Sequence, residues 1–186
     1  AYQTAYLKTY HKEDFIAATM STELTNTSKL REFVEELKKL NIEIIKPSIN
    51  KCFSDFKAIK GKLYYGLGAI KNVGYEAISN IVNEREKNGK YKSFNDFINR
   101  VDAKDVNKLQ LEGLTKSGVF DEFDKDRNKI LSSVPKIIQK IKNINDDKEN
   151  HQSNLFSEQE NEKEEFDFET ASPWSQKELL SHEFKS

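Results

Sequence analysis

The sequence is poor in the residues that build covalent cross-links and metal sites. Cys52 is the only cysteine among 186 residues, so the chain cannot form an internal disulfide. The three histidines, His11, His151 and His182, are too widely spaced to indicate a shared metal ion. We therefore expect neither redox nor zinc chemistry from this chain.

Long apolar runs are also missing. No stretch approaches the roughly 20 apolar residues that a membrane-spanning helix needs, and the first residues resemble neither a signal peptide nor a transit peptide. We expect a cytoplasmic protein with no membrane partner. The first residue is not Met, and a helical pattern is already under way there, so we expect the chain to be a piece of a longer protein.

Charge is plentiful but unevenly distributed. Charged residues make up 33% of the chain and hydrophobic residues 36%, which indicates a modest core under a highly charged surface. Residues 57–92 carry 8 basic and 3 acidic side chains, whereas residues 151–186 carry 3 basic and 9 acidic ones. The positive excess therefore lies in one short stretch, and the negative excess lies beyond residue 150.

Apolar spacing in the first third predicts two helices and a small β element. One helix covers residues 2–20 with a break around 11–14, and a second is capped by Thr27 or Ser28 and closed by Asn41. The spacing of apolar residues then changes from helical to strand-like, first in the β-branched stretch over 42–50 and again over 56–68. The second of these segments predicts a β-hairpin that turns at Lys60-Gly61.

The rest of the chain is predicted to be helical up to about residue 145. One helix is expected over 75–86, and a short helix is expected to follow a cap formed by Ser93 with Asp96. The helical pattern continues up to Gly118, and a last helix is expected over 133–143. Beyond Asn145 too few apolar residues remain to offset the entropy of ordering, so 146–170 is predicted to be a disordered acidic linker. The fold class is therefore mainly α with a small β-hairpin.

The segment YYGLGAIKNVGYEAISNIVNER, residues 64–85, has the form of a helix-hairpin-helix. A short helix around 68–71 is followed by the turn Asn72-Val73-Gly74 and by a second helix from Tyr75. Such a turn exposes backbone N–H groups, and the next helix directs its positive end at the same point, which suits a phosphate. The expected DNA-contacting residues are Lys62, Lys71, Asn72, Val73, Gly74, Tyr75 and Arg85.

A second, fainter copy lies in LEGLTKSGVFDEF, residues 111–123. It offers a helix, the hairpin Lys116-Ser117-Gly118 and Phe120, but its flanks are neutral, so it could serve mainly to pack against the first copy. The alternative for both copies is a purely structural role, in which a tight turn joins two core helices and the lysines are solvated. The acidic run over 121–126 is interpreted as a solvated loop and not as a metal site.

The acidic segment contains one apolar intrusion. Gln152, Leu155 and Phe156 stand at the spacing Q-x-x-L-F in a region that has no core to fill. A disordered segment can present such residues to a hydrophobic groove of another protein, where Gln adds directional hydrogen bonds.

Four blocks of this sequence, taken in order, resemble a known family. YQTAYLKTY, LNIEIIKPSIN, YYGLGAIKNVG and VNKLQLEGLTKSGVFDEF succeed one another as they do in the alpha subunit of bacterial replicative DNA polymerase III. The resemblance covers essentially the whole chain. It implies a DNA-directed DNA polymerase, a nucleotidyltransferase whose two Mg²⁺ ions are held by palm-domain aspartates. In the family those aspartates precede residue 1, so this piece should hold no cofactor and should not polymerise by itself.

The resemblance also implies a division of the chain and a set of partners. Residues 1–56 correspond to the end of the fingers, 57–145 to a tandem helix-hairpin-helix domain that holds duplex DNA, 146–170 to the linker, and 171–186 to the approach to an OB domain. In the family a Q-x-x-[LM]-F peptide docks into the β sliding clamp, which assigns that role to Gln152, Leu155 and Phe156. Further partners would be the other holoenzyme subunits, at the bacterial nucleoid.

Two other interpretations stay open at this point. The chain could be a scaffold protein whose helix-hairpin-helix units pack internally and whose tail serves an unrelated partner. It could also be the error-prone paralogue of the same polymerase, although the clamp-type peptide favours the replicative form.

Overall fold

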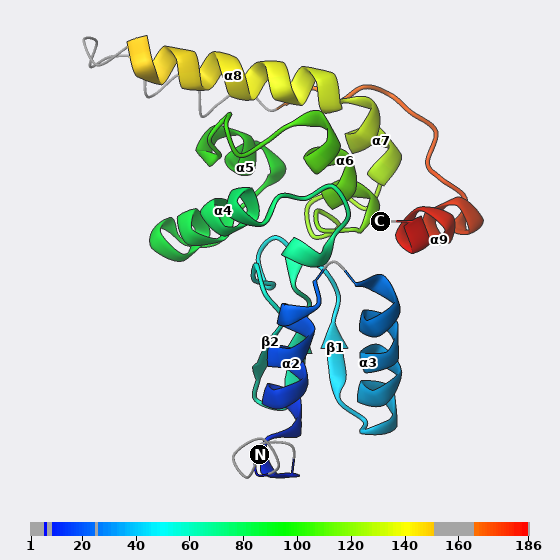
Figure 1. Ribbon diagram of the computed structural model, residues 1–186. Coiled ribbons are helices and arrows are strands. Elements are labelled where there is room, and N and C mark those ends of the chain that lie inside the picture. The colour runs from blue at the N-terminus through cyan, green and yellow to red at the C-terminus, as the bar shows by residue number, and fades with distance from the viewer. Residues whose placement is uncertain (1–5, 7–8, 25, 151–165, 186) are drawn as a thin grey trace.

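The structure is a computed structural model of the chain, and it describes residues 6, 9–24, 26–150 and 166–185. It is mainly helical with one small sheet, as predicted, and a unit of two helices and the sheet lies below a larger group of helices (Figure 1). The elements are α2 (Lys12–Thr22), α3 (Thr27–Lys39), β1 (Glu43–Ile45), β2 (Lys57–Ile59), β3 (Lys62–Tyr64), the 3-10 helix η1 (Leu67–Ala69), α4 (Tyr75–Asn88), α5 (Phe94–Arg100), α6 (Lys108–Lys116), α7 (Arg127–Ser132), α8 (Val134–Asn150) and α9 (Gln176–Lys185).

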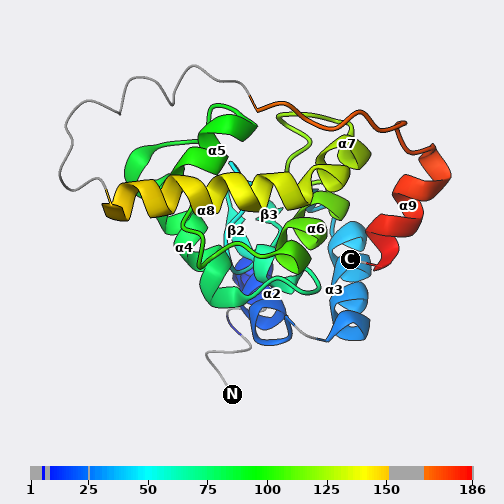
Figure 2. The same cartoon turned by 90° about the horizontal axis from the view of Figure 1, so that it is seen from above.

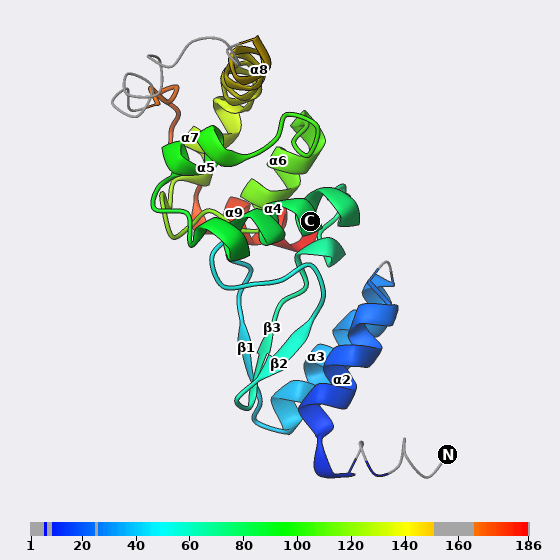
Figure 3. The ribbon, with the colours of Figure 1, turned by 90° about the vertical axis from the view of Figure 1, so that its left-hand side faces the viewer.

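A three-stranded sheet forms one side of the N-terminal unit. Its order is β1-β3-β2, with β1 parallel and β2 antiparallel to β3. The predicted hairpin is confirmed, because Lys60 and Gly61 between β2 and β3 both have the positive φ values that a tight hairpin turn requires. Helices α2 and α3 cover one face of the sheet (Figure 3), and the core between these layers includes Met20, Leu37 and Leu63.

The hairpin shares its core with the N-terminal helices. Phe56 and Leu63 are buried in the same cluster as Met20, and Tyr65 packs against both this cluster and the core of the larger helical unit. The expected boundary between residues 56 and 57 passes through this core, so it does not separate two packed units. The passage from one core to the other lies near Tyr65.

The ends of α3 show which local signals act as caps. The N-cap is Asn26 and not the expected Thr27 or Ser28, because the Asn26 side chain accepts a hydrogen bond from the backbone N–H of Lys29 at 3.3 Å. The predicted closure at Asn41 is confirmed: this residue has a φ of 55°, the left-handed conformation that ends many helices.

Aromatic side chains hold the centre of the helical unit. Phe94, Phe97 and Phe120 are buried, and the ring centroids of Phe94 and Phe97 each lie 5.0 Å from that of Phe120. The predicted cap of α5 is confirmed, because the Ser93 hydroxyl accepts from the Asp96 N–H at 3.1 Å. Helix α8 lies across α5 and α6 and closes this core (Figure 2).

Helix α8 continues past the predicted end at residue 143 and reaches Asn150. Polar contacts with the C-terminal end of α5 support the extension. The Asn145 amide donates to the carbonyl of Val101 at 3.3 Å, and the Lys148 ammonium donates to the carbonyl of Asn99 at 2.7 Å. A composition argument that counts apolar residues misses such contacts, so the predicted linker begins too early.

The far end of the predicted linker is also packed against the protein. Phe166 is buried, and the ring of Phe168 lies 5.4 Å from that of Phe94. The backbone N–H of Glu169 donates to the Ser133 hydroxyl at 2.8 Å. Residues 146–150 and 166–170 are therefore removed from the expected linker, and 151–165 lie outside the described residues.

Within the described part of the chain, no helix is long and apolar enough to cross a membrane.

Candidate nucleic-acid interface

The first hairpin has the predicted backbone conformation. Asn72 adopts a φ of 65°, and the N–H of Val73 donates to the carbonyl of Ile70 at 3.1 Å, which closes the turn after η1. Gly74, by contrast, has an ordinary φ of −71° and serves as the N-cap of α4. The left-handed residue is thus Asn72, one of the few residue types that adopt this conformation readily.

Helix α4 begins with open amides at the surface. Gly74 has no side chain with which to cap the helix, and among the described residues no side chain accepts from the first amides of α4. The aligned peptide dipoles give this end a partial positive charge, which favours an anion. Glu76 in the first turn opposes that preference, so an incoming phosphate needs a further cation.

Lys71 supplies such a cation at the same turn. It is exposed, and among the described residues no carboxylate lies within ion-pair distance of it. Asn72, Gly74 and Tyr75 are exposed beside it, whereas Val73 is half-buried. The structure therefore brings together five of the residues that were expected to contact DNA.

Tyr75 is held in place at the start of α4. Its hydroxyl donates to a carboxylate oxygen of Asp55 at 2.6 Å, and this hydrogen bond is the main cause of the raised pKa of Tyr75. Gly68 permits this position, because a Cβ there would come within 2.9 Å of the Tyr75 ring. Tyr75 remains 48% exposed, although its hydroxyl already forms this hydrogen bond. Sequence reasoning did not single out Asp55, since it lies 20 residues from Tyr75.

Arg85 does not belong to this surface, which corrects the expectation that it contacts DNA. Its side chain is 6% exposed, and its guanidinium donates to the carbonyls of Ile49 and Cys52 at 2.7 and 2.6 Å. Burial lowers the pKa of Arg85. The residue occupies the last turn of α4, away from the hairpin, and fastens the segment before β2 to the helical unit.

Lys62 lies at the start of β3, at the end of the sheet that points away from α4 (Figure 3). Its ammonium forms an ion pair with Glu43 at 2.7 Å, and the hydrogen bond to Glu43 raises the pKa of Lys62. The structure therefore does not place Lys62 beside the hairpin residues, although the two are close in sequence.

The second hairpin differs from the first because no helix starts directly after its turn. Gly118 has a φ of 79°, and the N–H of Val119 donates to the carbonyl of Leu114 at 3.0 Å, which is a helix C-terminal cap for α6. The next helix begins only at Arg127, so no helix N-terminus points at the turn. The expected Lys116-Ser117-Gly118 turn exists, but it follows the carbonyl end of a helix, so its backbone lacks the phosphate-binding geometry of the first turn.

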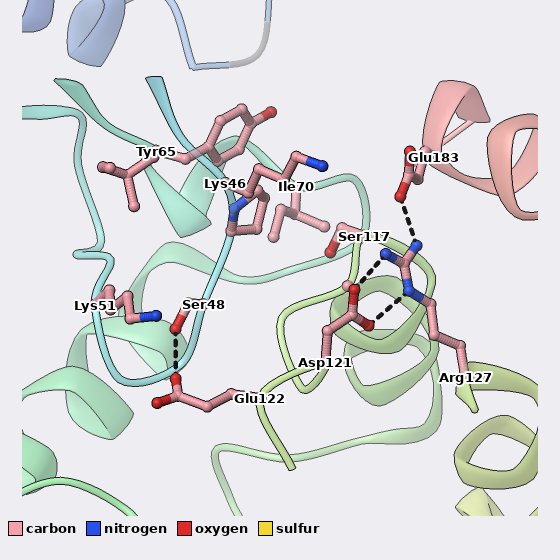
Figure 4. Close-up of a pocket in the computed structure, with 13 residues that line it drawn as sticks. Lys46, Ser48, Lys51, Tyr65, Ile70, Ser117, Asp121, Glu122, Arg127 and Glu183 are labelled. Carbon is pink, nitrogen blue, oxygen red and sulfur yellow. Dashed lines mark hydrogen bonds and ion pairs between the residues drawn. The ribbon is translucent and has the colours of Figure 1, made fainter. Parts of the chain in front are cut away.

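Arg127 fills the space beside this second turn. Its guanidinium donates to the carbonyl of Lys116 at 2.9 Å and to both carboxylate oxygens of Asp121, and it pairs with Glu183 of α9 at 2.8 Å (Figure 4). Desolvation opposes its charge, but these hydrogen bonds prevail and raise the pKa of Arg127. The second hairpin is thus fastened internally, as its neutral flanks suggested.

The acidic run after α6 is occupied by structural contacts. Asp121 pairs with Arg127, Asp124 pairs with Lys129 at 3.0 Å, and the Asp126 side chain caps α7. A cavity of about 500 Å³ adjoins Asp121 and is lined by residues of the second hairpin and of the loop after β1 (Figure 4). Its walls carry both charge signs, and the Ser48 hydroxyl donates across it to Glu122 at 3.2 Å.

Comparisons with known proteins agree with this geometry. A family model described as a helix-hairpin-helix motif matches residues 41–130. DNA polymerase III subunit alpha of Borreliella burgdorferi is 40% identical over 186 residues, which covers 98% of this chain. The chain belongs to the family of DNA polymerase III alpha subunits. The corresponding subunit of Campylobacter jejuni is 38% identical over 86% of the chain, and that of Thermus aquaticus is 37% identical over 75%.

The chain spans only a small part of these alpha subunits. It covers 16% of the Borreliella burgdorferi subunit, 14% of that of Campylobacter jejuni and 11% of that of Thermus aquaticus. Within this DNA polymerase III segment, Gln152, Leu155 and Phe156 lie outside the described residues. Their expected role as a clamp-binding peptide therefore stays a prediction.

Proposed function

We propose that this segment holds duplex DNA by its phosphate backbone as part of a DNA-directed DNA polymerase. One observation supports the proposal above all others: Lys71, which has no ion-pair partner in the part of the chain that the structure describes, lies beside the open amides of α4. Both features attract phosphate, and neither can distinguish one base from another. The expected binding is therefore independent of sequence and sensitive to salt.

The chemistry of the polymerase would lie elsewhere in the subunit. In this proposal two Mg²⁺ ions, held by aspartates outside this chain, stabilise the charge that develops during nucleotidyl transfer. The present segment binds the duplex behind the reacting end and holds no metal ion. In this proposal the segment positions the duplex, so its loss would lower the affinity of the polymerase for primer-template DNA and leave the metal site intact.

The second part of the proposal is a tether to the β sliding clamp. Gln152, Leu155 and Phe156 would dock in a hydrophobic groove of the clamp, within a holoenzyme in the bacterial cytoplasm and on the nucleoid. A peptide of micromolar affinity, roughly −8 kcal/mol, gains from DNA being held at the same time, because the second contact then forms within one complex.

A pair of lysine variants tests the DNA-holding function in the intact subunit. Lys71→Gln should weaken binding to a random-sequence duplex and lower the slope of log K against log salt by about 0.9, the value for one lost phosphate contact. Lys62→Gln is the matched control, because Lys62 is paired with Glu43 at the other end of the sheet. Fluorescence anisotropy over a series of NaCl concentrations measures both. Equal affinities and slopes for the two variants would reject the hairpin as a phosphate site and favour a scaffold role.

A further inference from the structure

Helix α9 lies beside both hairpins, although it begins only at Gln176 and the second hairpin already ends at Gly118. In Figures 1 and 3 its C-terminal end approaches the loop between η1 and α4. Its position is secured by the ion pair between Glu183 and Arg127. The Trp174 ring stacks on the His182 imidazole at 4.1 Å between centroids, which orients this histidine.

A groove of about 280 Å³ lies where α9, the first hairpin and α6 meet. The hairpin contributes Lys71 and Asn72, α9 contributes His182, and α6 contributes Leu109, Glu112, Gly113 and Lys116. The neighbouring residue of α9, Glu183, lines the larger cavity on the other side of the second hairpin. Helix α9 is thus seated between the two spaces and presents its histidine to the smaller one.

The residues that line the groove have a net positive charge, although one of them, Glu112, is a carboxylate. Glu112 is shared by two lysines, Lys116 at 3.1 Å and Lys108 at 4.0 Å, while Lys71 has no ion-pair partner among the described residues. Two cations therefore face the groove against a carboxylate that a third cation helps to neutralise. His182 adds an imidazole, which can donate a hydrogen bond to an anion.

We propose that this groove binds a second phosphate of the DNA backbone, next to the one at the start of α4. Lys71 and Lys116 supply charge, His182 donates an N–H group, and Asn72 lies on the border between the two phosphate positions. This inference rests on the proposed DNA-holding function and adds α9 to the interface. The chain on the far side of residues 151–165 would then contact the same duplex as the hairpin.

The test compares variants of α9 in the intact subunit. His182→Ala should weaken binding to a random-sequence duplex by roughly three- to tenfold at fixed salt, the range for one hydrogen bond. Leu180→Ala, on the same helix and 51% exposed, is the matched control and should bind like the unmodified subunit. Glu183→Gln, which loosens the pairing with Arg127, should reproduce part of the loss.

The outcomes separate this site from the hairpin itself. Unchanged or tighter binding by His182→Ala, together with weaker binding by Lys71→Gln, would overturn the groove and leave the hairpin function standing. If neither variant bound the duplex more weakly, both the groove and the hairpin would be rejected as phosphate sites. Inorganic phosphate at constant ionic strength should compete with the duplex no better than chloride; displacement at low millimolar concentration would make the groove a site for free phosphate and overturn its assignment to DNA.

Discussion

Gly113 in α6 and the carbonyl oxygen of Lys71 approach each other so closely that a Cβ atom on Gly113 would lie 2.7 Å from that oxygen. The second hairpin unit therefore supports the first through backbone contact. A glycine inside a helix costs about 1 kcal/mol relative to alanine, so its presence in α6 signals such an approach. The sequence carried this signal in LEGLTK, but it did not identify the partner.

Gly113→Ala should disturb the first hairpin turn, for which we propose DNA contact, from behind. The added methyl group meets backbone, which cannot rotate away, so we expect a loss of about 1–3 kcal/mol in the free energy of unfolding and weaker duplex binding. Urea unfolding and anisotropy measure the two effects. Gly74→Ala is the comparison for stability alone, because a Cβ there meets the Gln110 side-chain nitrogen at 3.2 Å and no backbone atom within 4 Å. A stable Gly113→Ala variant with full affinity would contradict the close contact.

Arg85→Met should destabilise the chain without changing its charge-dependent contact with DNA. The variant leaves the carbonyls of Ile49 and Cys52 without their donor in a buried site, for an expected loss of about 2–4 kcal/mol. The salt slope of duplex binding by the folded fraction should stay the same. Lys87→Met, at an exposed position of the same helix, serves as the control and should alter stability by less than about 0.5 kcal/mol.

Glu84 should make the stability of the helical unit depend on pH in the acid range. Desolvation raises the pKa of Glu84, but hydrogen bonds from Arg100 at 2.8 and 2.9 Å and from Asn88 outweigh it, and the pKa ends below its ordinary value. A lowered pKa in the folded state means that the stabilisation is present above the unfolded pKa, about 4.3, and is lost as pH falls through the folded value.

Glu84→Gln tests this contribution by urea unfolding between pH 7 and pH 3. The variant should be less stable than the unmodified chain by about 1–3 kcal/mol at pH 7, and the difference should shrink steadily below about pH 4.5. Glu32→Gln, at an exposed position of α3, should follow the unmodified chain throughout. A difference that stays constant down to pH 3 would show that Glu84 acts through packing and not through its charge.

The clamp tether makes a prediction that is independent of DNA. Leu155→Ala combined with Phe156→Ala should abolish binding of the intact subunit to the β sliding clamp, because both anchors of the docking peptide are removed. Duplex affinity in the absence of the clamp should not change. Ser153→Ala with Asn154→Ala alters the two intervening positions and should retain clamp binding. Surface plasmon resonance on immobilised clamp distinguishes the two double variants. Full clamp binding by Leu155→Ala with Phe156→Ala would reject the clamp-binding role of this peptide.

Features that depend on a few neighbouring residues were predictable. Asn72 and Asn41 adopt positive φ, Lys60-Gly61 turns the hairpin, and Ser93 caps α5, each because its own side chain or lack of one sets the local backbone energy. The first hairpin turn obeys such rules, so its backbone conformation was predictable, whereas its contact with DNA stays a prediction.

Errors arose where a distant contact decided the outcome. A charge count grouped Lys62 and Arg85 with the hairpin, yet one pairs across the sheet and the other is buried under the segment before β2. The linker was drawn too long because Asn145, Lys148 and Phe166 find partners that composition does not reveal.

The sequence by itself determined the family, through the resemblance of four blocks in order. It also determined the mainly helical fold and the conformation of the first hairpin turn, because apolar spacing and short-range sterics depend on neighbouring residues alone. Only the tertiary structure decided which cations face that turn and that α9 places His182 beside Lys71. Charge becomes a binding site only when folding brings it together and leaves it uncompensated, and that depends on contacts between residues more than 100 positions apart.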